Sequence, residues 1–432
     1  MNENVCTWSE RTAFAGFDWA SDHHDLVVID ARGKVLDEFR IEDTAEGWDR
    51  LRTRLARSPD LAVAIETSSG PAVERLLEAG YAVFPVNPAA AQEYRKRQAP
   101  SGTKTDHIDA WSMADALRLD GHTWRPLKPD DPLTVELRLL CRDEIALIEQ
   151  RTALVLQLRA ALHEYFPTAL QAFGDWTLPS AWAFIERFPT PQALREAGKR
   201  RWEKFLHVHK LWHSKELTAQ RLRLFEEAER FCGSPAVTNA KSLLAQSLAV
   251  QLRVLQGHLD EYAQRIAQRF EQHPDHDVFG SLPGVAEKLG PRLLGELGDD
   301  RARFESAESL QCFAGTAPIS FQSGQIHKAY FRRACQKTLR HSVHLWANLS
   351  RPECPWAQTY YQRKRAAGQS HACALRCLGQ RWLKILWKMW QTRTRYDAEL
   401  HQRNQIEHGS WIIALLPDAA RPAPVACPAA AL

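Results

Sequence analysis

The order of apolar runs in the first 120 residues restricts the fold more than any other feature of the chain. Short runs rich in Ala, Val, Ile and Phe alternate with amphipathic stretches, and each run has the length of a strand. Gly33 favours a hairpin turn at 31–34, because glycine adopts positive φ freely. The strand candidates are 12–18, 24–30, 35–41, 61–66 and 81–86.

Two helices are expected between the later strands. Asp43 and Glu46 are spaced as a capping box for a helix over 44–57. Pro71 suits the first turn of a helix over 71–79. Three strands, a helix, a strand, a helix and a strand is the order typical of an α/β, ribonuclease-H-like sheet.

Four carboxylates stand out against this predicted sheet. Asp18 lies mid-sheet on the first strand, and Glu66 ends the fourth. Such acids are costly unless they are exposed, paired or bound to metal. Asp106 and Asp109, three residues apart, have a plainer alternative, since acids near a helix start also favour the helix dipole. Together the four are suited to divalent cations, and two such metals can cut a phosphodiester.

Length and composition describe an ordinary soluble chain of two or three domains. Of its 432 residues, 44% are hydrophobic and 25% are charged. No apolar run approaches 18 residues and the N-terminus lacks signal-peptide features, so we expect no membrane partner and a cytoplasmic protein. The nine cysteines predict reduced thiols. His371, Cys373 and Cys377 are interpreted as core packing rather than a metal or redox site.

Positive charge is concentrated near the C-terminal end. Residues 321–412 hold 16 Lys and Arg against 4 Asp and Glu, although the whole chain has a net charge of only +4. This asymmetry predicts a polyanion-binding region, and a solvated basic helix face is the alternative. A second basic stretch precedes Asp106, where a surface turn with incidental charge is the alternative to backbone contacts with nucleic acid. Its candidate residues are Arg95, Lys96, Arg97 and Lys104.

The middle of the chain is expected to be helical. Apolar residues at 3–4 spacing predict one long helix over 132–166 and a second that includes 252–270. The two form either an antiparallel pair within the chain or a dimeric coiled coil. The helical insert between them, 167–235, holds four tryptophans that are interpreted as core rather than as a base-stacking platform: Trp176, Trp182, Trp202 and Trp212.

The C-terminal part completes a predicted division into four segments. The stretch 281–298 is similar to a helix-hairpin-helix, which presents backbone N–H groups to a phosphate. The Ala- and Pro-rich residues after 412 are expected to be disordered. The predicted segments are an α/β domain over 1–125, a helical region over 126–275, a C-terminal domain over 276–412 and a tail over 413–432.

Taken together, the motifs resemble the DEDD transposases of the insertion-sequence-110 type, the bridge-RNA-guided DNA recombinases. The four acids, with Lys104-Thr105 before the last pair, match the RuvC-like domain of that family. Its C-terminal transposase domain is matched by Leu282-Pro-Gly-Val285, by Cys312-Phe-Ala-Gly-Thr-Ala-Pro318 and by Gln322-Ser323-Gly324. The resemblance covers about 12–395. It implies that 1–125 is a RuvC-like (ribonuclease-H-like) domain, 126–275 a helical coiled-coil dimerisation region and 276–412 the serine transposase domain. One departure is Arg332-Arg-Ala-Cys335, which stands where family members commonly have Gly-Asn.

The resemblance implies a composite active site. Asp18, Glu66, Asp106 and Asp109 would hold Mg²⁺ or Mn²⁺, and Ser323 would attack a DNA phosphate to form a phosphoserine. Gly324 would let the backbone approach DNA closely. Ser320 ranks below Ser323 because no glycine follows it, and a simple turn is the alternative for Ser323-Gly324. The further candidates for contacts with nucleic acid are Lys328, Arg332, Arg333, Lys337, Arg340 and 363–365.

The implied partners are donor and target double-stranded DNA, a structured non-coding guide (bridge) RNA, and further copies of the chain, as a homodimer that assembles to a tetramer. The leading hypothesis is therefore a serine- and metal-dependent DNA recombinase. A metal-dependent RuvC-like nuclease that resolves branched DNA without covalent serine chemistry is the alternative. A non-catalytic RNA-binding scaffold is the third hypothesis, and it depends on the basic region alone.

Overall fold

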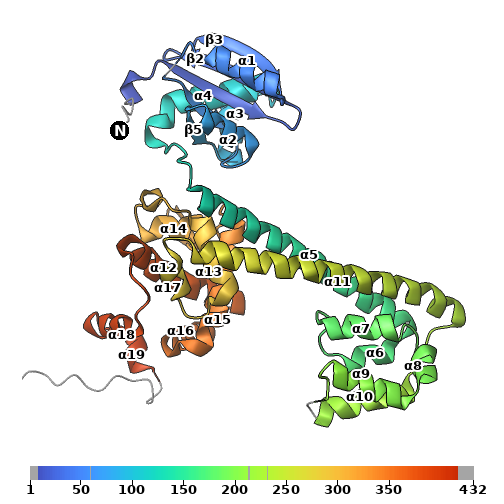
Figure 1. The fold of residues 1–432 in the computed structure, drawn as a ribbon. Helices are drawn as coiled ribbons and strands as arrows, with labels where there is room; N and C mark the ends of the chain where they lie inside the picture. The colour runs from blue at the N-terminus through green and yellow to red at the C-terminus, as the bar shows by residue number, and fades with distance from the viewer. Residues whose placement is uncertain (1–7, 59, 213–214, 231, 417–432) are drawn as a thin grey trace, which may run out of the picture. The chain divides into compact units, whose positions relative to one another are not determined.

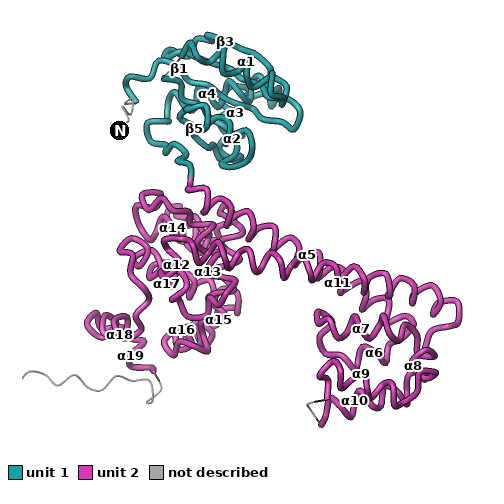
Figure 2. Tube along the Cα trace, in the orientation of Figure 1, with its two compact units in different colours: residues 1–129 teal, residues 130–432 magenta. Residues whose placement is uncertain are grey.

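The structure is a computed structural model that describes residues 8–58, 60–212, 215–230 and 232–416. The chain divides into two compact units, 1–129 and 130–432, which are described separately (Figure 2). The finer division of the second unit into a dimerisation region and a serine domain stays a prediction. The predicted tail begins too early, because Ile413 lies in a short helix and Leu416 is buried. The remainder of that tail lies outside the described residues.

The first unit contains the predicted ribonuclease-H-like sheet. Its strand order is β3-β2-β1-β4-β5, with β1, β2 and β3 antiparallel and with β4 and β5 parallel to β1 (Figure 1). All five predicted strands are present, and β1 lies in the centre as expected. The elements are β1 (Ala13–Trp19), β2 (His23–Asp30), β3 (Val35–Glu42), α1 (Ala45–Leu55), β4 (Ala62–Ile65), α2 (Pro71–Glu78), β5 (Ala82–Pro85), α3 (Pro88–Gln98) and α4 (Asp106–Asp120).

Both faces of this sheet are buried, because alternate side chains of a strand point to opposite sides. Ala15 and Phe17 of β1 pack with the apolar faces of α1 and α2. Phe14 on the same strand packs with α4 on the other face. Gly16 lies directly under α4, where an added Cβ would come within 1.8 Å of the Ala110 carbonyl oxygen. The absence of a side chain at Gly16 therefore lets α4 lie directly on β1.

The local predictions around this sheet are confirmed at one turn and wrong at one helix start. Gly33 has φ of 83°, and the Asp30 N–H donates to the Lys34 carbonyl at 2.9 Å, as the hairpin requires. The capping box is wrong because Thr44, one residue later than predicted, is the N-cap and accepts from the Gly47 N–H. Asp43 instead accepts from the Trp48 indole N–H at 2.7 Å.

The second unit is helical except for one β-hairpin. Its elements are α5 (Pro132–Tyr165), α6 (Pro167–Ala172), α7 (Pro179–Arg187), α8 (Pro191–Ala197), α9 (Lys199–Val208), α10 (Lys215–Glu227), α11 (Pro235–Glu271), α12 (His276–Gly280), α13 (Ala286–Leu297), α14 (Ala307–Phe313), β6 (Ile319–Ser323), β7 (Ile326–Tyr330), α15 (Lys337–Glu353), α16 (Pro355–Ala366), α17 (His371–Thr392), α18 (Ala398–Glu407) and α19 (Trp411–Ala414). Short 3-10 turns, Trp8–Glu10, Gly121–Thr123 and Arg301–Arg303, complete the described elements of the two units.

The two long helices, α5 and α11, form an antiparallel pair within the chain (Figure 1). Near one end of the pair the Lys241 ammonium lies 2.7 Å from the Glu164 carboxylate, and near the other Arg269 lies 3.0 Å from Glu136. The predicted antiparallel pair is thus confirmed. Coiled-coil geometry and a role in dimerisation stay predictions.

Two hydrophobic cores lie at either end of this pair. One belongs to the insert, where Trp176, Trp182 and Trp202 are buried as predicted, whereas Trp212 is 39% exposed and is not a core residue. The other core joins α12–α17 to the first turns of α5. Over the described residues, no helix is long and apolar enough to cross a membrane.

Candidate functional site

The four predicted carboxylates converge on one cavity of the first unit. Asp18, Glu66, Asp106 and Asp109 all line a cavity of about 460 Å³, together with Arg95, Lys104 and part of α3. Residues separated by up to 91 positions in the sequence therefore line the same cavity. Their function as metal ligands stays a prediction, whereas their proximity is a property of the fold.

The sheet topology explains this convergence. β1 and β4 are parallel neighbours, with Phe17 opposite Ile65, so Asp18 and Glu66 leave the sheet at the same edge. The close approach over Gly16 then brings the first turn of α4 to that edge. The Thr105 side chain caps this helix by accepting from the Ile108 N–H at 3.2 Å. Residues at i and i+3 share a helix face, which places both α4 acids toward the cavity.

The electrostatics of the cavity favour a cation. Burial, followed by the negative charges of Asp109, Asp106, Glu66 and Asp25, raises the pKa of Asp18 to about 6. Burial and Asp109 also raise the pKa of Glu66, against the opposing effect of Lys104 and Arg95. Burial is the larger cause of both rises, and the further contribution of neighbouring carboxylates indicates negative charge that is incompletely balanced. Carboxylate oxygens are the ligands that Mg²⁺ and Mn²⁺ prefer, so this donor set fits a divalent cation.

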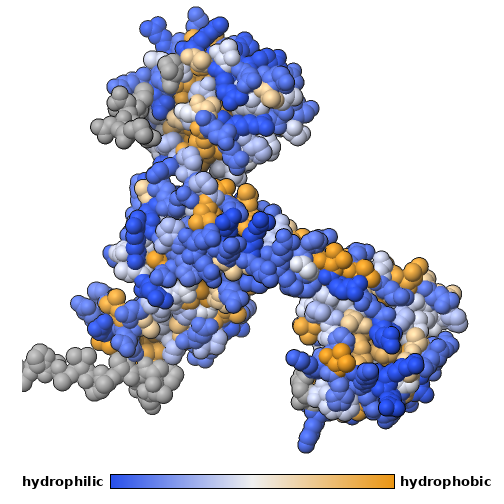
Figure 3. Space-filling view, viewed as in Figure 1, coloured by the Kyte–Doolittle hydropathy of each residue, from blue (hydrophilic) through white to orange (hydrophobic). Residues whose placement is uncertain are grey.

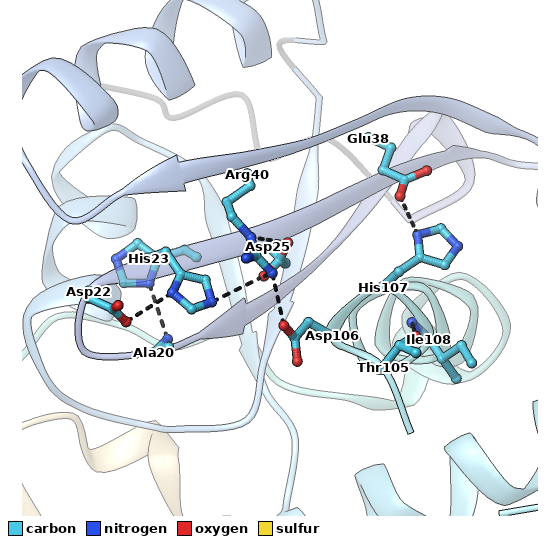
Figure 4. Close-up of polar contacts among 11 residues, drawn as sticks. Ala20, Asp22, His23, Asp25, Glu38, Arg40, Thr105, Asp106, His107 and Ile108 are labelled. Carbon is cyan, nitrogen blue, oxygen red and sulfur yellow. Dashed lines mark hydrogen bonds and ion pairs between the residues drawn. The ribbon is translucent and has the colours of Figure 1, made fainter. Parts of the chain in front are cut away.

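Two arginines already hold part of the quartet. The Arg95 guanidinium donates to both oxygens of Asp109, at 2.9 and 3.1 Å. Arg40, on β3, lies between Asp25 and Asp106 and donates to both carboxylates, the latter at 2.9 Å (Figure 4). Asp18 accepts no hydrogen bond from any residue that the structure describes. Among the described residues Glu66 likewise has no guanidinium partner, so a bound cation would meet two free carboxylates, Asp18 and Glu66, and two that carry guanidinium partners.

Sequence reasoning missed Asp25, His23 and Arg40. Donor atoms of His23, Asp25 and Asp106 all lie within 4.8 Å of one another, which makes a second group able to hold a metal at the border of the cavity. Asp25 lies directly opposite Asp18 in the β1–β2 ladder. Extending the register from the predicted turn at 31–34 would have found this pair, because opposite residues in a ladder share a face.

The predicted basic residues near the cavity have different environments. Arg95 and Lys104 line the cavity itself. Lys96 pairs with Glu93 at 2.7 Å, and Arg97 lies 3.8 Å from Asp115. Each of these residues except Lys104 therefore has a carboxylate partner, and their predicted contacts with nucleic acid stay predictions.

Ser323 lies at the tip of an exposed β-hairpin in the second unit. It ends β6 and pairs with Ile326 at the start of β7, and every residue of both strands is exposed. Gly324 has φ of 55°, and open space surrounds the position of an added Cβ. The alternative of a turn at Ser323-Gly324 is correct as geometry, and a nucleophilic function stays a prediction. Ser320, the competing serine, lies one residue into β6, opposite Ala329.

The basic residues after this hairpin are also distributed among different environments. Lys328 is exposed on β7, and Arg333 is exposed beyond it. The Arg332 guanidinium donates to the Ala317 carbonyl at 3.2 Å and so ties together the two ends of the hairpin. Lys337 and Arg340 line a separate pocket of this unit.

The segment 281–298, predicted to be similar to a helix-hairpin-helix, consists of a turn and α13, and α12 precedes it. The Gly284 N–H in this turn donates to the Glu353 carboxylate at 2.8 Å. An added Cβ on Gly284 would come within 2.5 Å of the Ser350 nitrogen, so the turn packs closely on the end of α15. This N–H is therefore bonded to a protein carboxylate, and phosphate binding by the turn stays a prediction.

The predicted core packing is confirmed for Cys377, which packs against the core of the second unit, and is wrong for His371, which is exposed and lies 2.8 Å from the Tyr361 hydroxyl. Cys373 and Cys377 are half-buried on α17, and the Gln369 side-chain oxygen accepts from both thiols. Neither belongs to a group of residues spaced to hold a metal in the described parts of the chain.

A ribonuclease-H-like sheet with an acidic quartet at its edge defines a class of enzymes that use divalent metal on nucleic acids. Two family models match the chain. A model described as a transposase matches residues 15–167, and one for the transposase family of IS116, IS110 and IS902 matches residues 276–362.

Known relatives support the same assignment. The mini-circle putative transposase for IS117 of Streptomyces coelicolor is 34% identical over 402 residues, which cover 91% of this chain and 97% of the relative. The IS900 uncharacterized 42 kDa protein of Mycobacterium paratuberculosis is 28% identical, over 89% and 97% of the two chains. The IS110 uncharacterized 43.6 kDa protein of S. coelicolor is 30% identical, over 70% and 74%.

The chain belongs to the IS110/IS116 family of transposases. It is an enzyme of DNA transposition and recombination, its substrates are DNA, and its acidic cluster indicates the use of divalent metal. Family membership decides against the hypothesis of a non-catalytic RNA scaffold.

Proposed function

We propose that this transposase exchanges DNA strands through a phosphoserine on Ser323, assisted by divalent cations at the acidic quartet. The observation that carries the proposal is the convergence of four predicted carboxylates on one cavity, with the pKa of Asp18 raised to about 6. Mg²⁺ is the expected ion, with Mn²⁺ as a substitute. The ions would be held by Asp18, Glu66, Asp106 and Asp109.

The chemistry at Ser323 is a transesterification. Its Oγ attacks a backbone phosphorus, one P–O bond of the DNA breaks, and the leaving oxygen takes up a proton. A DNA hydroxyl then attacks the phosphoserine, the new P–O bond of the DNA forms, the Oγ–P bond of Ser323 breaks, and the Ser323 oxygen takes up the proton that the DNA hydroxyl loses. Bound divalent cations would balance phosphate charge and stabilise the charge that develops in both steps.

Different residues of this chain would have different roles in the two-step transesterification. The exposed hairpin presents Ser323, and the open space at Gly324 permits close approach of DNA. Arg332 fixes the base of the hairpin. Arg40 and Arg95 orient Asp106 and Asp109. In this proposal the Ser323 hydroxyl is a weak nucleophile, and its activation would come from metal ions at the acidic quartet.

A guide RNA and an assembly of several copies belong to the same proposal. The RNA follows from the family resemblance, and base pairing would then choose the DNA sites. A homodimer, paired into a tetramer, is supported by exposed hydrophobic residues on the long helix pair, over which Figure 3 shows hydrophobic patches. On α11, Leu243, Val250 and Val254 are 71%, 44% and 55% exposed. Their spacing of seven and four residues is that of a coiled-coil seam. Action on DNA would place the enzyme at the nucleoid.

Trapping of a covalent adduct tests the serine mechanism. The full-length protein is incubated with guide RNA, donor and target DNA and Mg²⁺, quenched in denaturant, and the adducted peptide is mapped by mass spectrometry. We expect DNA on Ser323, with none in Ser323→Ala, and normal levels in the matched variant Ser320→Ala. An adduct on another residue, or strand exchange retained by Ser323→Ala, would refute the proposal.

A four-acid nuclease that resolves branched DNA is the second candidate. It is favoured by the fact that the acidic cavity is complete within the first unit. This candidate predicts metal-dependent cleavage of branched DNA by Ser323→Ala and its loss in Asp18→Ala and Asp106→Ala. The serine mechanism requires both sites, so Ser323→Ala separates the two.

A further inference from the structure

A small basic pocket in the second unit has no assigned function. Its volume is about 270 Å³, and it lies where the end of the β6–β7 hairpin meets α15 and α17. Val343 and Leu375 supply an apolar part of the wall. The polar and aromatic lining that matters here is Phe331, Lys337, Arg340, His341, His344 and Arg376. Lys337 and Arg340 are among the basic residues predicted from the sequence, and the other four are new.

The cations of this pocket lack acidic partners. No carboxylate of the described residues pairs with Lys337, Arg340 or Arg376. Elsewhere in the same unit arginines do find such partners, as when Arg292 lies 2.8 Å from the Glu144 carboxylate. The pocket thus concentrates positive charge that the protein leaves unbalanced, and an anion would balance it.

One arginine also lacks an acceptor. The Arg340 Nη1 atom is buried and has no hydrogen-bond partner. A buried donor on a charged group that has no acceptor is energetically unfavourable, so such atoms are rare unless a ligand or ion completes them. A ligand oxygen at this atom would remove the cost.

An exposed aromatic ring holds the two guanidinium groups in place. Phe331 is 43% exposed, and the Cζ atoms of Arg340 and Arg376 lie 5.1 and 4.5 Å from its ring centroid. Cation–π attraction therefore draws two like charges to one ring from two different helices. Arginine pairs of this kind match the several oxygens of a phosphate group, which guanidinium binds through paired N–H donors.

The neighbouring histidines reflect the same positive potential. Burial, together with the positive charges of His371, His341 and Arg376, lowers the pKa of His344. His344 is thereby biased toward its neutral form, in which one ring nitrogen can donate to an anion.

We propose that this pocket binds one backbone phosphodiester of the bound nucleic acid, away from the bond that is cut. The inference depends on the proposed function for its substrate. Ser323 pairs with Ile326, and five residues of extended chain, about 16 Å, separate Ile326 from Phe331. At about 3.4 Å of duplex axis per nucleotide, the bound phosphate lies about five nucleotides from the scissile one. The pocket would hold the strand in register while Ser323 reacts.

The test measures how binding depends on salt. Each phosphate contact contributes about −0.9 to the log–log slope for duplex DNA and about −0.7 for single strands. Full-length protein with Ser323→Ala, which prevents reaction, is titrated with a 30-base-pair duplex and, separately, with a single-stranded RNA. We expect Arg340→Gln and Arg376→Gln each to weaken binding and to reduce the slope by about one contact. Arg340→Lys should retain most of the binding affinity and of the slope.

A matched variant controls for the loss of surface charge. Arg381 also lies on α17 and over an aromatic ring, 5.8 Å from the centroid of Tyr360, but it does not line the pocket. Arg381→Gln should leave the slope unchanged. A changed slope for DNA alone, RNA alone or both identifies the source of the phosphate. An unchanged slope for both, or an equal change in Arg381→Gln, overturns the inference.

The salt titration of the pocket variants is independent of the serine chemistry. Binding is measured without a nucleophile, so a pocket effect can be present even if no adduct forms on Ser323. Conversely, adduct formation in the protein with Ser323 intact can stand when the pocket variants bind normally. The two failures are therefore distinguishable.

Discussion

Replacing Asp18 by Asn should stabilise the metal-free enzyme. The pKa of Asp18 is raised from 3.8 to about 6, chiefly by burial. Each pKa unit corresponds to about 1.4 kcal/mol, so the full shift would be worth about 3 kcal/mol. The carboxylate is only half-buried, and solvent screening reduces this to about 1–2 kcal/mol. Asn has nearly the same shape and cannot ionise.

The sign of the effect follows from proton linkage. Because the pKa is higher in the folded state, the folded protein holds this proton more tightly than the unfolded chain does. The contribution of Asp18 to the free energy of unfolding is therefore unfavourable above about pH 6, and it disappears below about pH 4. Asp18→Asn should raise the free energy of unfolding of the metal-free enzyme at pH 8 and have little effect on it at pH 4.

Hydrogen–deuterium exchange of the full-length protein measures this locally. In EDTA at pH 8, amides of β1 and β4 in Asp18→Asn should be about tenfold better protected than in the wild type, with α15 and α17 as an internal reference. Asp49→Asn is the matched control, since Asp49 is exposed and pairs with Arg52 one turn away. In excess Mg²⁺ the wild type should instead be better protected than Asp18→Asn, because the ion stabilises only the wild type. Reduced protection of the variant in EDTA at pH 8, or an equal gain at pH 4, would refute the reasoning.

Three further predictions follow from the contacts described above. Arg40→Gln frees Asp106 and should raise the affinity for Mn²⁺ about two- to fivefold, because exposed ion pairs are worth about 0.2–1 kcal/mol; electron paramagnetic resonance titration measures this, and weaker binding would contradict it. Gly16→Ala should displace α4, cost at least about 1–3 kcal/mol and weaken Mn²⁺ binding in the same titration, and unchanged Mn²⁺ affinity would show that α4 does not position its acids. Trp202→Ala should cost about 3–5 kcal/mol in chemical denaturation, because the ring is fully buried and its N–H donates to the Arg221 carbonyl at 2.8 Å, whereas exposed Trp212→Ala should cost less than 1 kcal/mol; equal losses would contradict the assignment of the core.

The sheet and its acids could be predicted because their signals are local. Runs of apolar residues give the strands, and their order places Asp18 centrally and Glu66 at a strand end. The first helix start was missed by one residue, since Asp43 and Thr44 are both good caps and only the bond to Trp48 decides between them.

The remaining site residues depend on contacts that the local pattern does not contain. Arg40 on β3 donates to Asp25 on the neighbouring strand β2 and to Asp106 on α4, which is 66 residues away in the sequence. Arg376 joins Arg340 only because α17 packs on α15. Trp212 has the same residue type as its buried neighbours but lies near the surface, which composition alone does not reveal.

The lack of a Cβ at Gly16 sets the distance between β1 and α4 in the first unit. With hydrogen in place of Cβ at position 16, the helix that bears two acids rests against the strand that bears a third, at a separation no other residue type permits. If the carboxylates bind a cation as proposed, the spacing between them, and hence the size of the ion that they would share, depends on a residue that has no chemistry of its own.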